Sequence, residues 1–198
     1  MEYVPGSSVQ DYMKATGPLD VSETLSINYQ CCLGLAYIHY HGVIHRDIKP
    51  GNIMYHPVQG IAKLMDFSIA NRIEEPPLPD IGTIAYMAPE HFDPNRKITV
   101  LTDIFALGST IYRVLTGEYP FTSKNTVNQI LNHDPEPITN IRPDVPQELV
   151  AMIDKAMAKK DSDRFQSAAE FARETERIIN LLYPNSELLN VSGKYMDL

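Results

Sequence analysis

Cysteine is scarce in this chain and tryptophan is absent. The two cysteines, Cys31 and Cys32, are adjacent in a helical pattern, so their side chains point to different sides. This predicts reduced, packed thiols rather than a disulfide or a metal site, as in a cytoplasmic protein. The six histidines show no metal-ligand spacing. We therefore expect no histidine metal centre and give the other histidines, such as His39, structural or surface positions.

The chain also lacks an excess of basic residues and long runs of apolar residues. The net charge is -8, and no basic block is present that could neutralise the phosphates of a nucleic acid. No apolar stretch is long enough to span a bilayer, and the first residues lack a basic segment followed by an apolar one, so we expect no secretory signal. With 198 residues, of which 43% are hydrophobic, the chain is expected to form one domain with a sizeable core.

Hydrophobic periodicity gives a mostly helical pattern with a small β element. A helix over 102–116 carries apolar residues on every side, which predicts a buried central helix. Its Asp103 must then be a buried carboxylate with hydrogen-bond partners. Other expected elements are helices over 9–14, 22–41, 123–132, 147–159 and 166–182, and strand-like pieces at 1–4, 43–44, 53–55 and 62–65. Ser22 and Thr102 are the expected N-caps of their helices.

Residues 45–52, His-Arg-Asp-Ile-Lys-Pro-Gly-Asn, combine three kinds of group in one tight loop. Asp47 offers a carboxylate that can receive a hydroxyl proton, Lys49 a cation, and Asn52 an amide oxygen. Transfer of a phosphoryl group needs such a set, because the nucleophile must be oriented, the phosphate charge balanced and Mg²⁺ held. An ordinary surface loop with a capping asparagine is the simpler alternative.

Four further motifs follow in order along the chain. Asp66-Phe67-Ser68 comes after a predicted strand, Ala88-Pro89-Glu90 follows Thr83, Asp103 opens the stretch D-x-F-x-x-G, and Arg164 precedes the last helix. Together with the octapeptide they resemble the C-terminal lobe of eukaryotic-like (Hanks-type) serine/threonine protein kinases, and the last helices are similar to those of bacterial members. Ser68 departs from the family's D-F-G pattern, and its side chain should make this turn less free to flip.

The resemblance implies a site that transfers the γ-phosphoryl group of ATP to Ser or Thr of a protein substrate. Asp47 would orient the hydroxyl, Lys49 would contact phosphate, and Asn52 and Asp66 would hold Mg²⁺, with Thr83 bonding near Asp47 and Lys49. The adenine and ribose would meet Glu2, Val4, Ser8 and Met54. Structural support would come from His45, Arg46, Glu90, Asp103 and Arg164, the last paired with Glu90 in a partly buried ion pair.

The ATP-gripping half of such a kinase is missing from the sequence. No G-x-G-x-x-G occurs, and residues 1–8 resemble the hinge between the two lobes. We therefore expect a hinge-like segment at 1–8, a kinase C-lobe at 9–183 and a tail or linker at 184–198. The N-lobe is expected from the parent polypeptide, and this chain alone should be inactive or weak because phosphate positioning supplies most of the chemistry.

Two alternatives of other classes stay open. A non-catalytic kinase-like module for docking or regulation would fit the missing lobe, although the intact Asp47, Asn52 and Asp66 speak against it. A small-molecule phosphotransferase shares an H-x-D-x-x-x-x-N loop, but Lys49 and the A-P-E element do not fit it. Gly51 occupies a position where kinases of basic substrates often carry Glu, so nothing favours a basic-site preference.

The segment between Ser68 and Thr83 contains no other hydroxyl residue but carries Glu74, Glu75 and Asp80. One hypothesis is that one of these carboxylates pairs with Arg46 in place of a regulatory phosphate. The alternative is that all three are solvated loop charges.

Overall fold

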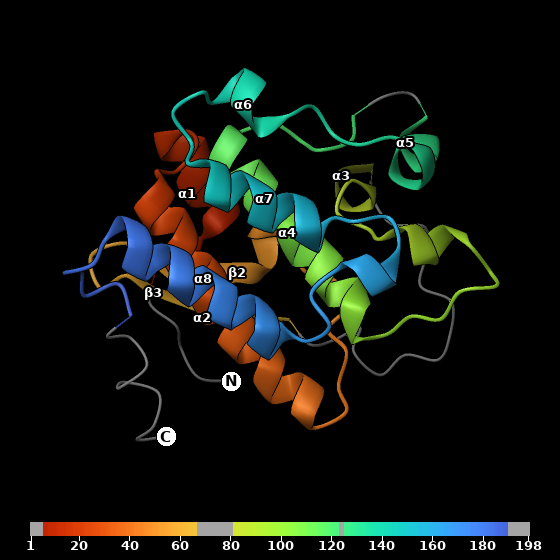
Figure 1. The fold of residues 1–198 in the computed structure, drawn as a ribbon, viewed down its shortest axis with the longest axis horizontal. Helices are drawn as coiled ribbons and strands as arrows, with labels where there is room; N and C mark the ends of the chain where they lie inside the picture. The colour runs from red at the N-terminus through yellow and green to blue at the C-terminus, as the bar shows by residue number, and fades with distance from the viewer. Residues whose placement is uncertain (1–5, 67–80, 123–124, 190–198) are drawn as a thin grey trace.

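The computed structural model describes residues 6–66, 81–122 and 125–189. Its elements follow in chain order: β1 (Ser7–Ser8), α1 (Val9–Thr16), α2 (Val21–Tyr40), β2 (Ile53–His56), β3 (Ile61–Leu64), α3 (Ile81–Ile84), α4 (Val100–Thr116), α5 (Thr126–Asn132), α6 (Ile138–Ile141), α7 (Gln147–Ala156) and α8 (Ala168–Leu182). Short 3₁₀ turns lie at Pro50–Asn52, Pro89–Phe92 and Asp161–Asp163. The expected mostly helical fold with a small β element is confirmed (Figure 1).

Helix α4 is the central helix, as the sequence predicts. Ile104, Phe105 and Leu107 have no exposed surface, and burial of each such side chain stabilises the fold by roughly 1.5–3 kcal/mol. Its N-cap is Thr99 rather than Thr102, because Thr99 accepts from the backbone of the first turn while the Thr102 hydroxyl accepts from the Thr99 N–H. The helix begins two residues earlier than expected for this reason.

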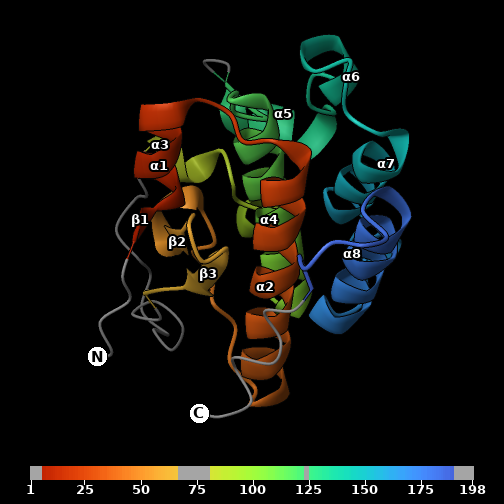
Figure 2. The same cartoon turned by 90° about the vertical axis from the view of Figure 1, so that its left-hand side faces the viewer.

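Helix α2 connects the two sides of the molecule. It packs most extensively against α8 and also contacts β3, so that the small sheet lies on one side of α2 and helices α7 and α8 on the other (Figure 2). Its N-cap is Asp20, whose carboxylate accepts from the Glu23 N–H at 2.8 Å. The predicted cap, Ser22, is wrong; its hydroxyl donates to Asp20 instead.

The sheet is antiparallel in the order β1-β2-β3. Ile53 pairs with Leu64 and His56 with Ile61, which places Asn52 at the end of β2 across from the residues that leave β3. Residues 43–44 are not a strand, contrary to the prediction; the Val43 N–H bonds to the Ile38 carbonyl and so closes the turn that follows α2. This sheet therefore positions one side of the predicted site.

The remaining boundaries differ from the prediction by a few residues. Helix α1 is longer than expected, α7 ends at Ala156 and α8 starts at Ala168. Helix α6 was not expected, because it lies in a proline-rich connection; burial of Ile138 and a hydrogen bond from Tyr112 to the Glu136 carbonyl fix it there. No helix in the described part of the chain is long and apolar enough to cross a membrane.

Candidate active site

Four of the predicted site residues meet at the loop that precedes β2. Lys49 Nζ lies 2.8 Å from Asp47 Oδ2 and donates to Thr83 Oγ1 at 3.3 Å. Asn52 Nδ2 donates to the same Asp47 oxygen at 2.7 Å and to the Asp47 carbonyl at 2.8 Å. Both contacts to the carboxylate use Oδ2, so Oδ1 remains for a further donor such as a hydroxyl. The side chain of Asp47 is 10% exposed, which strengthens such a bond.

Asp66 lies next to Asn52 because the ladder of β2 and β3 continues one step beyond the strands. The Met65 N–H donates to the Asn52 carbonyl at 2.8 Å, and Asp66 follows directly, exposed and with a φ of 61°. Asn52 uses its amide nitrogen toward Asp47, which leaves its amide oxygen for a cation. One amide oxygen and one carboxylate suit Mg²⁺, which keeps waters and substrate phosphates as its other ligands.

The backbone of the loop is held by Asp103 at the start of α4. The carboxylate of Asp103, with no exposed surface, accepts from the backbone N–H groups of His45 and Arg46, each at 2.8 Å. Arg46 has a φ of 69°, a left-handed conformation that costs a non-glycine residue roughly 1–3 kcal/mol. His39, near the end of α2, approaches Asp103 Oδ2 with Nε2 at 2.8 Å. The buried Asp103 is thus satisfied, as its position in an apolar helix requires.

His45 joins the loop to the chain after β3. Its ring is buried; Nδ1 accepts from the Asp47 N–H at 3.3 Å, and Nε2 lies 3.0 Å from the Met65 carbonyl. Acceptance at Nδ1 leaves the proton on Nε2, which then donates to that carbonyl. The ring therefore sets the distance between Asp47 and the residue that precedes Asp66.

Glu90 and Arg164 form a buried bidentate ion pair, with oxygen–nitrogen distances of 2.7 and 2.9 Å and side-chain exposures of 1% and 0%. The pair is more deeply buried than expected. Burial by itself would raise the pKa of Glu90, but the hydrogen bonds and charge of Arg164 outweigh it and hold this pKa below its ordinary value. Thr102 also donates to Glu90, which ties the end of the 81–92 segment to α4.

The predicted nucleotide contacts are less complete. Glu2 and Val4 lie outside the described residues, as do Ser68, Glu74, Glu75 and Asp80. Ser8 and Met54 are cross-strand partners in β1 and β2. Met54 is half-buried rather than in the core, and the Ser8 hydroxyl accepts from the Asp11 N–H as the N-cap of α1. That capping role competes with a ribose contact.

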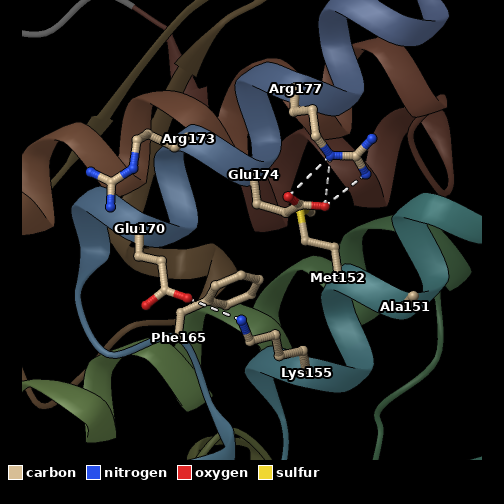
Figure 3. A pocket seen from close by; sticks show the side chains of 8 residues that line it. All are labelled: Ala151, Met152, Lys155, Phe165, Glu170, Arg173, Glu174 and Arg177. Atoms are coloured by element: carbon tan, nitrogen blue, oxygen red, sulfur yellow. Dashed lines mark hydrogen bonds and ion pairs between the residues drawn. The ribbon is translucent and has the colours of Figure 1, made fainter.

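A cavity of about 500 Å³ lies elsewhere, against α7 and α8 (Figure 3). Four of its charged side chains form ion pairs: Lys155 with Glu170 at 3.0 Å and Arg177 with Glu174 at 2.8 Å. None of the residues predicted for phosphoryl transfer lines it. Size alone therefore does not identify the site, and the chemistry points to the loop at 45–52.

Sequence reasoning missed His39, because its contact to Asp103 joins residues 64 positions apart. No spacing in the sequence shows this pair. The sequence shows only that a buried Asp103 needs hydrogen-bond donors, and this requirement does not tell which residue supplies them.

The model of the protein kinase domain matches residues 1–175 of the chain. The chain belongs to the protein kinase family. The serine/threonine-protein kinase PknB of Mycolicibacterium smegmatis is 35% identical over 187 residues, a match that covers 90% of this chain and 30% of that protein. PknB of Mycobacterium tuberculosis is 34% identical over 189 residues, and this match also covers 30% of that protein.

A solved structure of the Rad53 kinase domain and SCD2 in complex with AMPPNP has a TM-score of 0.73 to this chain at 27% identity. The match covers 88% of this chain and 66% of that one. The two PknB proteins are bacterial serine/threonine-protein kinases, in agreement with the Hanks-type resemblance. The chain spans 30% of the length of the curated relatives given above.

Proposed function

We propose that this chain supplies the catalytic half of a serine/threonine protein kinase, which transfers the γ-phosphoryl group of ATP to a Ser or Thr hydroxyl of a protein. The observation that carries the proposal is the interlocked set of Asp47, Lys49, Asn52 and Thr83. Asp47 Oδ1 accepts the substrate hydroxyl hydrogen and orients the oxygen for attack. The Lys49 charge, 2.8 Å from Asp47 Oδ2, faces the phosphoryl group and balances its negative charge.

Asn52 and Asp66 would hold Mg²⁺, which when bound neutralises the charge that develops between the phosphates. The fit rests on the donor set, one amide oxygen and one exposed carboxylate at the end of β2 and β3. Glu2 and Val4 would bond the adenine through the backbone, with Met54 beneath it. Ser8 is the least supported of these contacts, because its hydroxyl caps α1.

Residues 1–8 act in this proposal as the hinge to an N-lobe in the parent polypeptide, 9–183 as the C-lobe and 184–198 as a tail or linker. The buried free thiols of Cys31 and Cys32 support a reducing, cytoplasmic location. Burial raises the pKa of Cys31 to about 12, so this thiol stays protonated. The net charge of -8 supports a protein rather than a nucleic-acid substrate.

The test compares Asp47→Asn with the exposed Asp134→Asn in the full polypeptide that the gene encodes. Asp47→Asn should slow phosphate transfer from Mg·ATP to a generic protein substrate by about 10²–10⁴-fold, the contribution of a positioned base. Asp134→Asn, the same change in an exposed connection, should leave the rate unaltered. Equal rates for both variants, or folded protein that binds Mg·ATP without transfer, would favour the non-catalytic docking module.

A further inference from the structure

A second cavity, of about 270 Å³, opens beside the proposed phosphate-transfer site. Pro50, which follows Lys49, forms one part of its wall, and Tyr86 forms another. Tyr86 also lines the small space next to Asp47 and Thr83, and its N–H bonds to the Thr83 carbonyl at 3.1 Å. A peptide whose hydroxyl reaches Asp47 therefore passes close to the mouth of this cavity.

The charged side chains that line this cavity are Lys14 and Arg113, and none of its lining residues in the described part of the chain is acidic. Lys14 is paired with Asp11 at 2.8 Å and is 66% exposed, so much of its charge is already balanced. Arg113 forms no ion pair with a described carboxylate; its guanidinium stacks over the Tyr119 ring at 4.1 Å. The half-buried Arg113 is thus the main cation available to a ligand.

Two aromatic residues hold Arg113 in place. The Tyr86 hydroxyl accepts from the Arg113 guanidinium, and burial raises the pKa of this hydroxyl, so the phenol stays neutral. Tyr119 fixes the plane of the guanidinium from one face. A guanidinium held flat presents two parallel N–H groups, the geometry that a carboxylate accepts.

The cavity between α7 and α8 gives a direct contrast (Figure 3). There Lys155 and Arg177 meet acidic partners from the same cavity. The acidic residues adjacent in sequence to the wall of the cavity next to Pro50 are Asp11 and Glu118; both are exposed and neither is part of the wall, and Asp11 is paired with Lys14. Gly51 adds no side chain to this wall either; a Cβ there would lie 3.0 Å from Gln10 Oε1.

We propose that this cavity binds an acidic side chain of the protein substrate near the phosphorylated Ser or Thr, with Arg113 as the residue that sets the preference. The inference rests on the proposed function and narrows it to substrates with a Glu or Asp close to the acceptor residue. A neutral side chain would leave the guanidinium without an anionic partner. A basic one would meet like charge, which costs affinity.

The test measures binding rather than catalysis, with the full polypeptide that the gene encodes. Fluorescence anisotropy follows labelled peptides with one Ser in an alanine background and a single Glu, Gln or Lys at each position from four before to four after it. We expect one or two adjacent positions at which Glu binds about five- to tenfold more tightly than Gln and Lys binds more weakly, the effect of a partly exposed charge-assisted bond. A phosphoserine series at the same positions separates a carboxylate site from a phosphate site.

Variants assign the effect to Arg113. Arg113→Gln should remove the preference for Glu, Arg113→Lys should keep part of it, and Arg113→Glu should transfer it to the Lys peptides. Arg173→Gln, which removes the same charge from the cavity of Figure 3, should leave the preference intact. Circular dichroism establishes that each variant is folded, and Arg113→Gln, which retains the aliphatic stem, serves if charge reversal prevents folding.

Two results would overturn the proposal: Glu peptides that bind no better than Gln peptides at every position, or a preference for Glu that folded Arg113→Gln retains. Phosphate transfer measured on the same peptides separates this failure from that of the proposed function. Transfer without a preference for Glu would reject the acidic pocket alone. An Arg113-dependent preference without transfer would keep the pocket and reject the kinase activity.

Discussion

Replacement of Arg164 by methionine should lower the free energy of unfolding by about 3–5 kcal/mol at pH 7, because it removes the bidentate partner of the buried Glu90 carboxylate and leaves only Arg96, at 3.5 Å, and the Thr102 hydroxyl beside it. Arg164 also donates to the backbone carbonyls of Ala158 and Leu101 at 2.8 and 3.0 Å, and these acceptors would lose their donors too. A domain of this size has a total stability of roughly 5–15 kcal/mol, so the loss would be a large part of it. The melting temperature should fall by about 6–20 °C.

The size of the loss should depend on pH. In the intact protein the pKa of Glu90 is lowered, so its contribution to stability is present above the ordinary value near 4.5 and is lost as pH falls through the folded value. Without Arg164 the burial of Glu90 remains, and the more distant and partly exposed Arg96, at 3.5 Å, balances it less, so the pKa of Glu90 should rise above the ordinary value. The folded state then binds the extra proton, and its stability declines as pH rises above about 4.5. The difference between the two proteins should therefore be smaller at pH 4 than at pH 7.

Urea unfolding of the Glu90→Gln, Arg164→Met and double variants at both pH values tests this reasoning. The double variant should be more stable than the sum of the single changes predicts, by about 1–3 kcal/mol, because it leaves neither member of the bidentate pair buried without the other. Additive losses, or an Arg164→Met loss below about 1 kcal/mol that does not change with pH, would refute the assignment of the pair as a buried ionic anchor.

Three further predictions concern other parts of the chain. Gly108→Ala should destabilise the fold by about 1–3 kcal/mol in urea unfolding, because a Cβ there would lie 2.9 Å from side-chain atoms at the end of α7. The control Gly34→Ala should be neutral or stabilising, because the added Cβ meets only a flexible leucine side chain at 3.3 Å. Burial lowers the pKa of Lys159 to about 8, so the unfolded chain binds the proton of this lysine more strongly than the folded protein does. The free energy of unfolding should therefore rise between about pH 8 and 10.5 relative to that of Lys159→Met, and parallel profiles of this free energy against pH in the two proteins would contradict the prediction. His39→Ala should slow phosphate transfer with little change in Mg·ATP affinity, since His39 acts through Asp103, and His39→Gln, which keeps a donor, should restore part of the rate.

The central helix and each of the site motifs could be predicted from the sequence, because each depends on residues close together in the chain. An apolar residue on every face of 102–116 has few explanations other than burial. The exact start could not be predicted: Thr99 and Thr102 are both suitable caps, and the choice depends on which hydroxyl meets the free N–H groups. Ser22 failed as a cap for the same reason, since Asp20 reaches the first turn with a full negative charge.

Short elements were predicted less well because tertiary contacts fix them. Residues 43–44 have strand-forming side chains but find no partner strand; the β1-β2-β3 sheet of the described residues is complete without them. Helix α6 forms among prolines because Ile138 is buried and Tyr112 donates to a carbonyl next to it. Local propensity cannot contain such information.

The geometry of the active site is set by tertiary contacts and not by the octapeptide at residues 45–52 alone, although that octapeptide indicates the chemistry. Arg46 and Asp66, at either end of the site, both have positive φ, at 69° and 61°. Conformations of this kind persist only where surrounding contacts hold them, and for Arg46 that contact comes from Asp103, 57 residues away. His45 connects the two strained positions through its bond to the Met65 carbonyl. A peptide of residues 45–52 would contain every group needed for the chemistry and would still lose the arrangement, since the residues that stabilise both strained positions lie in α4, in α2 and after β3.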